Sequence, residues 1–380
     1  MRLAVLVAAL GAAVHVPLGA QAVPPARRIF ERAVELDRRG DAAAALSLLW
    51  EAAGLAPHDG EILQALGGAL ERIGALDGAI DAYAAAVRSP HPPRGASNSL
   101  VLALVKAGRS GDAIAHARSL TSASPADADP WFSLGLAQAE VDVDGATDSF
   151  RRALARDERH ALARYNLGLL YFRTDRFEMA IEELQRALAI QPRPEVHYAL
   201  ANIYRHLGDL DRAVRALTDA VAANREYAEA HLALGALYKT KRDWKRAEAS
   251  LMHAARLRPD LAAPQILLAQ TLSLAGDEAG ARRAATEADR LRTLFQQSQE
   301  AATLTAAGAQ AYDAGDAAGA AELFRRATRA FDAFAPAHYQ LGRALPRLGQ
   351  LDAAKAAFDR AQQLNPALVP PQIKSQRASQ

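Results

Sequence analysis

Residues 161–192 read ALARYNLGLLYFRTDRFEMAIEELQRALAIQP, and residues 228–259 repeat the same pattern as AEAHLALGALYKTKRDWKRAEASLMHAARLRP. Each stretch begins with apolar residues at helical intervals and continues, after a short polar turn, with a second set of the same kind. The closing residues, Pro192 and Pro259, have no amide hydrogen and therefore end the second helix. Each stretch thus predicts two consecutive helices joined by a tight turn.

The same pattern fills the chain from Ala26 to Ala367, with a period of about 34 residues. Gly and Ala recur where two helices must approach closely, larger apolar residues recur between them, and strand signals are missing. The repeat units are predicted to start near residues 26, 60, 94, 128, 161, 194, 228, 262, 301 and 335. The sequence therefore predicts one all-α solenoid of about ten helix-turn-helix repeats over residues 23–368.

The small, aromatic and proline residues of these units carry a family resemblance. In the clearest unit they are Tyr165, Leu167, Gly168, Tyr171, Ala180 and Pro192. With this spacing the chain resembles the tetratricopeptide repeat family. The resemblance implies a right-handed superhelix whose first helices line a concave groove, and repeat arrays of this kind usually hold another macromolecule there.

Some segments depart from the regular pattern. Residues 278–299 contain no Pro and no Gly after Gly280, so we expect a longer helix that bridges two units. Pro346 lies inside a first helix and should kink it. Residues 89–93, SPHPP, are interpreted as an ordinary turn between units rather than a hinge. The polar, Pro-containing end of the chain, residues 369–380, is predicted to be disordered.

The N-terminus has the pattern of an export signal. Arg2 supplies a positive start, residues 3–14 supply an apolar stretch, and Ala20-Gln21-Ala22 offers small residues for cleavage before Val23. An uncleaved membrane anchor is the alternative, but the apolar stretch is shorter than the roughly 20 residues that span a bilayer. We therefore expect residues 1–22 to be a signal peptide and the mature protein, without an integral membrane span, to be periplasmic or secreted.

Composition and motifs exclude several classes of function. Half of the 380 residues are hydrophobic, the formal net charge is +2, and Lys and Arg are dispersed, so a nucleic-acid partner is not expected. The sequence lacks the common motifs of zinc peptidases, phosphate-binding loops and serine hydrolases, and it has no cysteine. We therefore expect neither enzymatic activity nor a cofactor.

Three histidines could suggest a metal site. His197, His231 and His338 all occupy the place in their units that Trp131 occupies in an earlier unit. One residue type at one place in different units lies far apart along a solenoid. These histidines are therefore predicted to pack rather than to bind a metal.

Two pairs of acidic residues could also suggest a metal site or a catalytic site. Asp142, Asp144 and Gly145 resemble the opening of a calcium loop, but the downstream Glu ligand is absent, so a turn with a helix-capping Asp is the better interpretation. Glu182 and Glu183 are interpreted as a solvated face rather than a catalytic pair.

The resemblance also predicts a binding surface. In the family, ligand contacts come from the second, fifth, sixth, ninth and twelfth places of the first helices. Carried onto this chain, with one bordering lysine, they give Tyr165, Asn166, Leu169, Phe172, Tyr198, Asn202, Arg205 and Lys239. Aromatic, amide and guanidinium groups at helical spacing can clasp an extended peptide. The alternative is that the aromatic residues only pack in the core.

Three classes of function remain open. The favoured one is an exported, non-catalytic scaffold that binds a protein or peptide during assembly of a cell-envelope complex such as secretion, pilus or polysaccharide-export machinery. A self-associating structural array is the alternative, and it would show an apolar outer face around Ile29, Phe30 or the last unit. A regulatory repeat subunit of an enzyme complex is the third.

Overall fold

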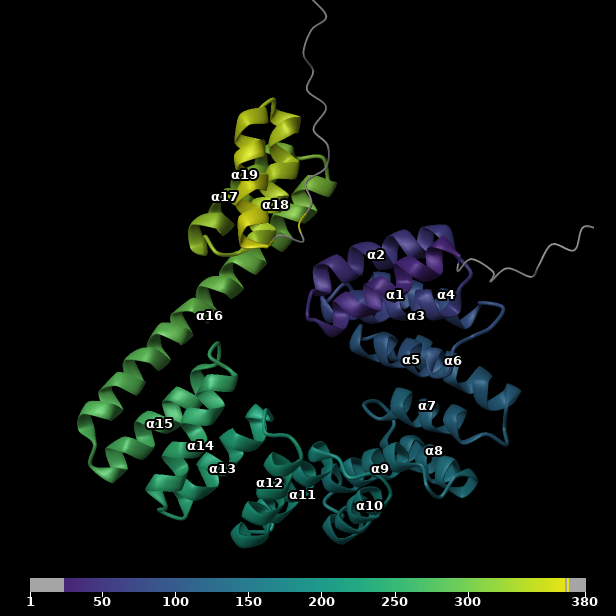
Figure 1. Ribbon diagram of the computed structural model, residues 1–380, viewed down its shortest axis with the longest axis vertical. Coiled ribbons are helices and arrows are strands. Elements are labelled where there is room, and N and C mark those ends of the chain that lie inside the picture. The colour runs from purple at the N-terminus through teal and green to yellow at the C-terminus, as the bar shows by residue number, and fades with distance from the viewer. Residues whose placement is uncertain (1–23, 366–367, 369–380) are drawn as a thin grey trace, which may run out of the picture. The chain divides into compact units, whose positions relative to one another are not determined.

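The computed structural model describes residues 24–365 and residue 368, and within them it contains nineteen α-helices and one 3₁₀ helix but no strand (Figure 1). The predicted signal peptide, residues 1–22, and the predicted disordered tail, residues 369–380, lie outside the described residues. The described residues divide into two compact units, one that ends at Ala103 and one that begins at Leu104. The prediction of an all-α repeat fold is confirmed.

The helices follow one another as hairpins in both units. The first unit contains α1 (Pro25–Arg38), α2 (Ala42–Leu55), α3 (Gly60–Arg72), α4 (Leu76–Val87) and most of α5 (Ala96–Lys106). The second unit contains α6 (Ser110–Ala123), α7 (Ala128–Gln138), α8 (Val143–Arg156), α9 (Ala161–Arg173), α10 (Phe177–Ile190), α11 (Pro194–His206), α12 (Leu210–Ala223), α13 (Ala228–Thr240) and α14 (Trp244–Leu257). It continues with α15 (Ala262–Ala275), α16 (Glu278–Asp313), α17 (Ala317–Ala330), α18 (Ala335–Ala344), the 3₁₀ helix η1 (Leu345–Leu348) and α19 (Leu351–Leu364).

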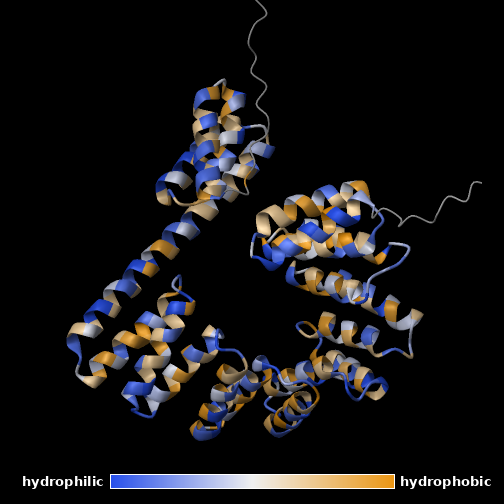
Figure 2. Cartoon of the chain, in the orientation of Figure 1, coloured by the Kyte–Doolittle hydropathy of each residue, from blue (hydrophilic) through white to orange (hydrophobic). Residues whose placement is uncertain are grey.

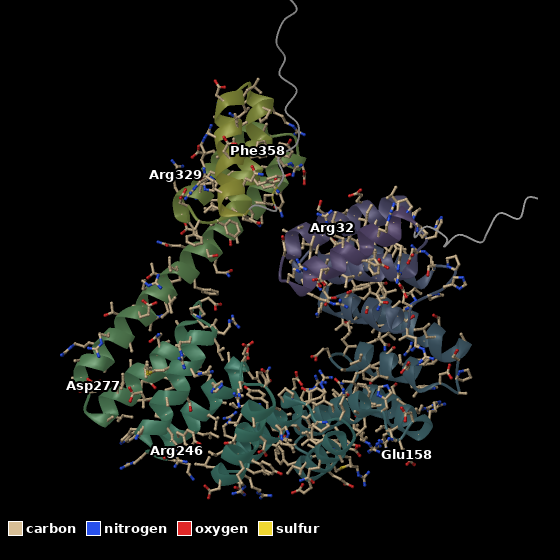
Figure 3. All side chains as sticks on the ribbon, in the orientation of Figure 1. Arg32, Glu158, Arg246, Asp277, Arg329 and Phe358 are labelled. Carbon is tan, nitrogen blue, oxygen red and sulfur yellow. The ribbon has the colours of Figure 1, made fainter. Side chains whose placement is uncertain are left out.

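Small residues allow the two helices of a hairpin to approach. A Cβ atom at Gly168 of α9 would lie 2.8 Å from Cγ of Leu184 on α10, closer than two carbon atoms can pack. At the equivalent place of α7, a Cβ atom at Gly135 would lie 2.6 Å from the ring of Phe150 on α8. Gly342 faces Phe358, labelled in Figure 3, in the same way. The recurrent Gly therefore lets a large apolar side chain of the second helix fill the hairpin.

In most hairpins the turn between the two helices has one residue in the left-handed region, although the turn between α7 and α8 has none. Gly208 provides it between α11 and α12, with φ of 76°. In the two clearest repeats a residue with a side chain does so instead, Asp175 with φ of 57° and Arg242 with φ of 59°. In these two repeats the hairpin turn thus keeps the same backbone conformation without a Gly.

The irregular segments behave largely as the sequence predicts. The longer helix expected over residues 278–299 is confirmed, because α16 runs unbroken for 36 residues from its cap Asp277, labelled in Figure 3. Figure 1 shows that α16 pairs with α15 along its first part and with α17 along its last part. Pro346 ends α18 and converts the next residues to η1, as expected of a proline inside a helix. Residues 89–93 form the turn between α4 and α5, where Pro93 packs against Gly60.

The apolar residues are spread along the helices in stripes, with polar residues beside them (Figure 2). Among the described residues, no helix combines the length and the hydropathy that crossing a bilayer would require. Ile29 and Phe30 of α1 are half-buried, and the guanidinium of Arg27 lies 5.1 Å from the Phe30 ring centre. The first helix therefore does not present these two side chains as a bare apolar face.

Candidate functional site

The predicted site residues lie on first helices of consecutive hairpins. α9 contacts α11, and α13 contacts α15, whereas no two consecutive second helices among the described residues make a comparable contact. Because a stack of hairpins bends toward the side where its helices come closest, these contacts indicate that the first helices form the inner side between α9 and α11 and between α13 and α15. We call the surface formed by the predicted site residues of α9, α11 and α13 the inner face.

Tyr198 of α11 is partly committed to packing. Its ring centre lies 5.4 Å from that of Tyr227, the residue that precedes α13, and both side chains are half-buried. Burial, followed by the neighbouring Tyr198 and Glu195, raises the pKa of Tyr227 to about 12. Phe132 makes the equivalent contact with His160 in an earlier repeat, at 4.7 Å. Ring packing at this place is therefore a structural feature of the repeat.

Tyr165 and Asn166 of α9 are also half-buried. Burial raises the pKa of Tyr165, and the carboxylate of Glu195 on the next hairpin adds to the effect, whereas Arg193 opposes it. Nδ2 of Asn166 donates to the carbonyl oxygen of Leu162, 2.8 Å away in its own helix. The phenol of Tyr165 remains available to a ligand, but the amide donor of Asn166 is already engaged.

Leu169 and Phe172, further along α9, pack against the core. The Phe172 ring lies 6.1 Å from Phe177 of α10 and 6.0 Å from His206 of α11. The three rings join two hairpins, since Phe177 and His206 are themselves 4.8 Å apart. Packing, the alternative raised for the aromatic residues, thus accounts for most of the Phe172 surface.

Asn202 and Arg205 of α11 are different. Asn202 is half-buried and Arg205 is exposed, and neither side chain forms a hydrogen bond or ion pair with any residue that the structure describes. Lys239 of α13 donates from Nζ to Oε1 of Gln270 on α15, at 2.6 Å. Apart from the phenol of Tyr165 and the charge of Lys239, which pairs with no carboxylate of the described residues, the polar groups of the inner face that remain free to bind a partner lie on α11.

The place shared by Trp131 and the histidines has a defined role. Trp131 Nε1, His231 Nε2 and His338 Nε2 lie 3.1, 3.0 and 2.9 Å from the carbonyl oxygen of the residue six positions earlier. Arg164 donates to the equivalent carbonyl, that of Glu158, at 2.9 Å. No group of three possible metal ligands occurs among the described residues. His231 and His338 thus bond to the turn that precedes their helix, and the sequence signal that we missed was the recurrence of side-chain donors at one place.

The two acidic pairs singled out in the sequence have different structural roles. Asp142 accepts from the backbone N–H of Gly145 at 2.9 Å and caps α8, as the sequence predicts. The interpretation of Glu182 and Glu183 as a solvated face is wrong for Glu183. The Glu183 side chain is only 14% exposed and accepts from Nη1 of Arg164 at 2.8 Å, whereas Glu182 is 57% exposed. Glu183 therefore holds α9 to α10 through a largely buried ion pair.

Known proteins resemble the chain along most of its described length. Models of the tetratricopeptide repeat match residues 30–93, 98–140, 138–203, 194–237, 228–261 and 335–368. Tetratricopeptide repeat protein 8 of Homo sapiens is 33% identical over 116 residues, which cover 30% of this chain and 21% of that protein. The Mus musculus protein is also 33% identical over 116 residues and is matched over 22% of its length. The chain thus spans about a fifth of the length of these curated relatives.

Solved structures with the same repeat match at lower identity. Pseudomonas aeruginosa pilF is 22% identical, covering 57% of this chain and 93% of that chain, with a TM-score of 0.46. A tetratricopeptide repeat protein from Parabacteroides merdae is 17% identical, covering 65% and 98%, with a TM-score of 0.48. The MamA protein is 20% identical, covering 43% and 91%, with a TM-score of 0.41.

Proposed function

Because the chain belongs to the tetratricopeptide repeat family, whose arrays are protein-binding scaffolds, we propose that its inner face binds an extended peptide segment of a protein partner. The observation that carries the proposal is the pair Asn202 and Arg205, whose side chains form no hydrogen bond or ion pair with the described residues. They are three positions apart on α11, so both project from one face of the helix.

The chemistry of these groups suits an extended peptide. The amide of Asn202 can accept from a peptide N–H and donate to a peptide carbonyl, and the guanidinium of Arg205 can form two parallel hydrogen bonds with a carboxylate. Tyr198, one turn before Asn202 on α11, and Tyr165 on α9 add half-buried rings. A few such contacts correspond to roughly micromolar binding, about 8 kcal/mol, once the costs of association are included.

The proposal extends to where the scaffold acts. The signal-like pattern of residues 1–22 supports an exported protein, periplasmic or secreted. There the scaffold would recruit or align components of a cell-envelope assembly without catalysing a reaction itself. The absence of the common catalytic motifs from the sequence supports a non-catalytic role.

The test is photocrosslinking from Arg205, replaced by a photoreactive residue, in native envelope material. Arg215, exposed on the second helix α12, is replaced in the same way as the matched control. We expect one dominant foreign adduct from position 205 and not from 215. The crosslinked segment, made as a synthetic peptide, should bind at least about tenfold more weakly to an Asn202→Ala, Arg205→Ala double variant.

Two results would count against the proposal. Self-adducts alone from position 205 would favour the self-associating array, and identical adducts from both positions would show nonspecific capture. Mass spectrometry of the same preparation gives the N-terminus of the protein. A chain that starts at Val23 is expected, and an intact Met1 in envelope material would contradict export with cleavage.

A further inference from the structure

Beside the inner face, a hollow of about 590 Å³ lies between α13, α15 and α16. We call it the α15 hollow, and its lining residues are Lys239, Ala269, Gln270, Ser273, Leu274, Ala281, Arg282 and Ala285. Apart from Lys239, none of them belongs to the predicted site.

The charge of the α15 hollow is positive and uncompensated. Lys239 and Arg282 line it, whereas no Asp or Glu does. The partner of Lys239 is the neutral amide oxygen of Gln270, 2.6 Å away, and Arg282 forms no ion pair within residues 24–365. Arg258 and Arg290, by contrast, each have a carboxylate partner, in Asp260 and Glu287. A carboxylate from another molecule would complete the pairing.

The rest of the α15 hollow is apolar and small. Ala269, Ala281 and Ala285 leave space between α15 and α16, and Leu274 stands at the side with 62% of its surface exposed. An isolated Leu with so much exposure gains free energy when another aliphatic side chain covers it. The hollow therefore offers cations and an apolar wall to the same ligand.

We propose that the α15 hollow binds an acidic side chain and an adjoining aliphatic side chain of the partner peptide, with Lys239 and Arg282 pairing with the carboxylate. This inference rests on the proposed function, since it gives the chemistry of the partner for one end of the inner face. Arg205, which also lacks a carboxylate partner among the described residues, occupies in α11 the place that Lys239 occupies in α13. The partner is thus a segment in which acidic and aliphatic residues alternate, with a second carboxylate at Arg205.

The experiment uses a fluorescein-labelled peptide made of consecutive Glu-Leu-Gly repeats and measures its fluorescence anisotropy with the full mature chain. Two further peptides replace every Glu by Gln or every Leu by Ser. The Lys239→Gln, Arg282→Gln variant is compared with Lys245→Gln, Arg283→Gln, which removes the same charge from two exposed residues that do not line the hollow. Circular dichroism confirms equal helicity.

The acidic, Leu-containing peptide should bind the wild type, and each replacement peptide should bind at least about tenfold more weakly. The Lys239→Gln, Arg282→Gln variant should lose about the same factor, whereas the charge-matched control should stay within about twofold. Equal loss in both variants would reduce the effect to net charge and overturn the inference. Full competition by millimolar inorganic phosphate would do so as well, because it would indicate a simple anion site.

The failure of this inference can be told apart from the failure of the proposed function. If the peptide captured from position 205 binds the Lys239→Gln, Arg282→Gln variant as tightly as the wild type, only the α15 hollow is excluded. If the Glu-Leu-Gly peptide needs Lys239 and Arg282 but no foreign adduct forms at Arg205, the hollow binds acidic segments and the inner face of α11 does not take part.

Discussion

The hairpins from α7 to α13 and the long helix α16 differ in how neighbouring repeats meet. From Phe132 to Leu237 the buried apolar residues form one continuous cluster. In α16, Leu291 and Ala301 are buried, but every residue between them is exposed or half-buried. From Ala301 onward the buried residues form separate small clusters, one around Phe324 and one with Ala301. The difference shows that a repeat shares a core with its neighbour only where the chain turns back between them.

This difference arises from the positions of Pro and Gly in the sequence. Pro192 and Pro259 end second helices, so the next hairpin folds back against the previous one. Residues 281–307 contain neither Pro nor Gly, and the helix continues through the place where a turn would otherwise form. A continuous helix keeps its two halves in line and leaves its middle without a partner helix.

The largest expected effect is the difference in stability lost when a side chain is removed from the shared core of α7 to α13 and when one is removed from the exposed middle of α16. Phe150 is fully buried, with its ring against Gly135 and 5.9 Å from Phe132, whereas Phe295 in the middle of α16 is 63% exposed. Phe150→Ala leaves a cavity and should lower the free energy of unfolding by about 3–5 kcal/mol. Phe295→Ala should change it by no more than about 0.5 kcal/mol. Urea titrations followed by circular dichroism measure both.

Similar losses in the two variants would mean that the middle of α16 is covered in solution, by a partner or by a second copy of the chain. Repeating the titration of Phe295→Ala at several protein concentrations would then distinguish these two. A dependence on concentration points to self-association.

The second effect concerns α16 alone. Gln296 is exposed in its middle, and Gln296→Pro removes one helical hydrogen bond and introduces a clash with the preceding turn, which costs about 3 kcal/mol locally. Because no core crosses this segment, we expect the unfolding curve to split, with the transition of the α7 to α13 core unchanged. Gln296→Ala, the control, should unfold as the wild type does. One transition that shifts as a whole would show that α16 couples the two parts.

Much of the difference between these two regions could be predicted from the sequence. The spacing of Leu167, Tyr171 and Ala180 predicted the helix pairs, and the lack of Pro and Gly after Gly280 predicted the long helix. Pro346 predicted a kink, and the structure has the end of α18 and a 3₁₀ helix there. These features depend on residues close together in the chain. Their structural consequences follow from local backbone preferences and therefore need no knowledge of the stacking.

The features that the sequence did not reveal depend on contacts between distant residues. Glu183 was expected in solvent, yet it pairs with Arg164 across the hairpin because both side chains turn toward the same interior position. Tyr198 was assigned to the binding face, but its ring lies against Tyr227 of the next linker. The first contact depends on how the two helices of a hairpin pack and the second on the angle at which one hairpin stacks on the next, and a repeat pattern carries no information on either.

The smallest effect is a dependence of stability on pH that arises in the repeats around α13. His231 lies with its ring centre 4.1 Å from that of His253. Burial lowers the pKa of His231, and the charges of His253 and Arg256 lower it further, although the hydrogen bond to the Arg225 carbonyl opposes them. Burial also lowers the pKa of His116, whose Nε2 has no hydrogen-bond partner in the described part of the chain.

The direction of this pH dependence follows from the linkage between proton binding and unfolding. Because the folded pKa of His231 lies below its ordinary value of 6.5, the unfolded chain binds more protons as the pH falls below that value. The contribution of neutral His231 to the free energy of unfolding is therefore fully present above pH 6.5. It is lost as the pH falls toward the pKa of His231 in the folded protein. Asp209 and Asp243, whose pKa values are held below 3.8 by hydrogen bonds from Arg212 and Arg246, stay ionised throughout this window.

Urea titrations between pH 7.5 and pH 5 should thus show a wild-type free energy of unfolding that decreases with falling pH. The informative variant is His231→Trp, because Trp131 occupies the same place in its repeat and donates to the equivalent carbonyl. This variant keeps the hydrogen bond but cannot be protonated, so its free energy of unfolding should decrease less as the pH falls. The decrease that remains should come from His116. An unchanged slope would show that His231 does not titrate in this range, and the pH dependence would then belong to His116 alone.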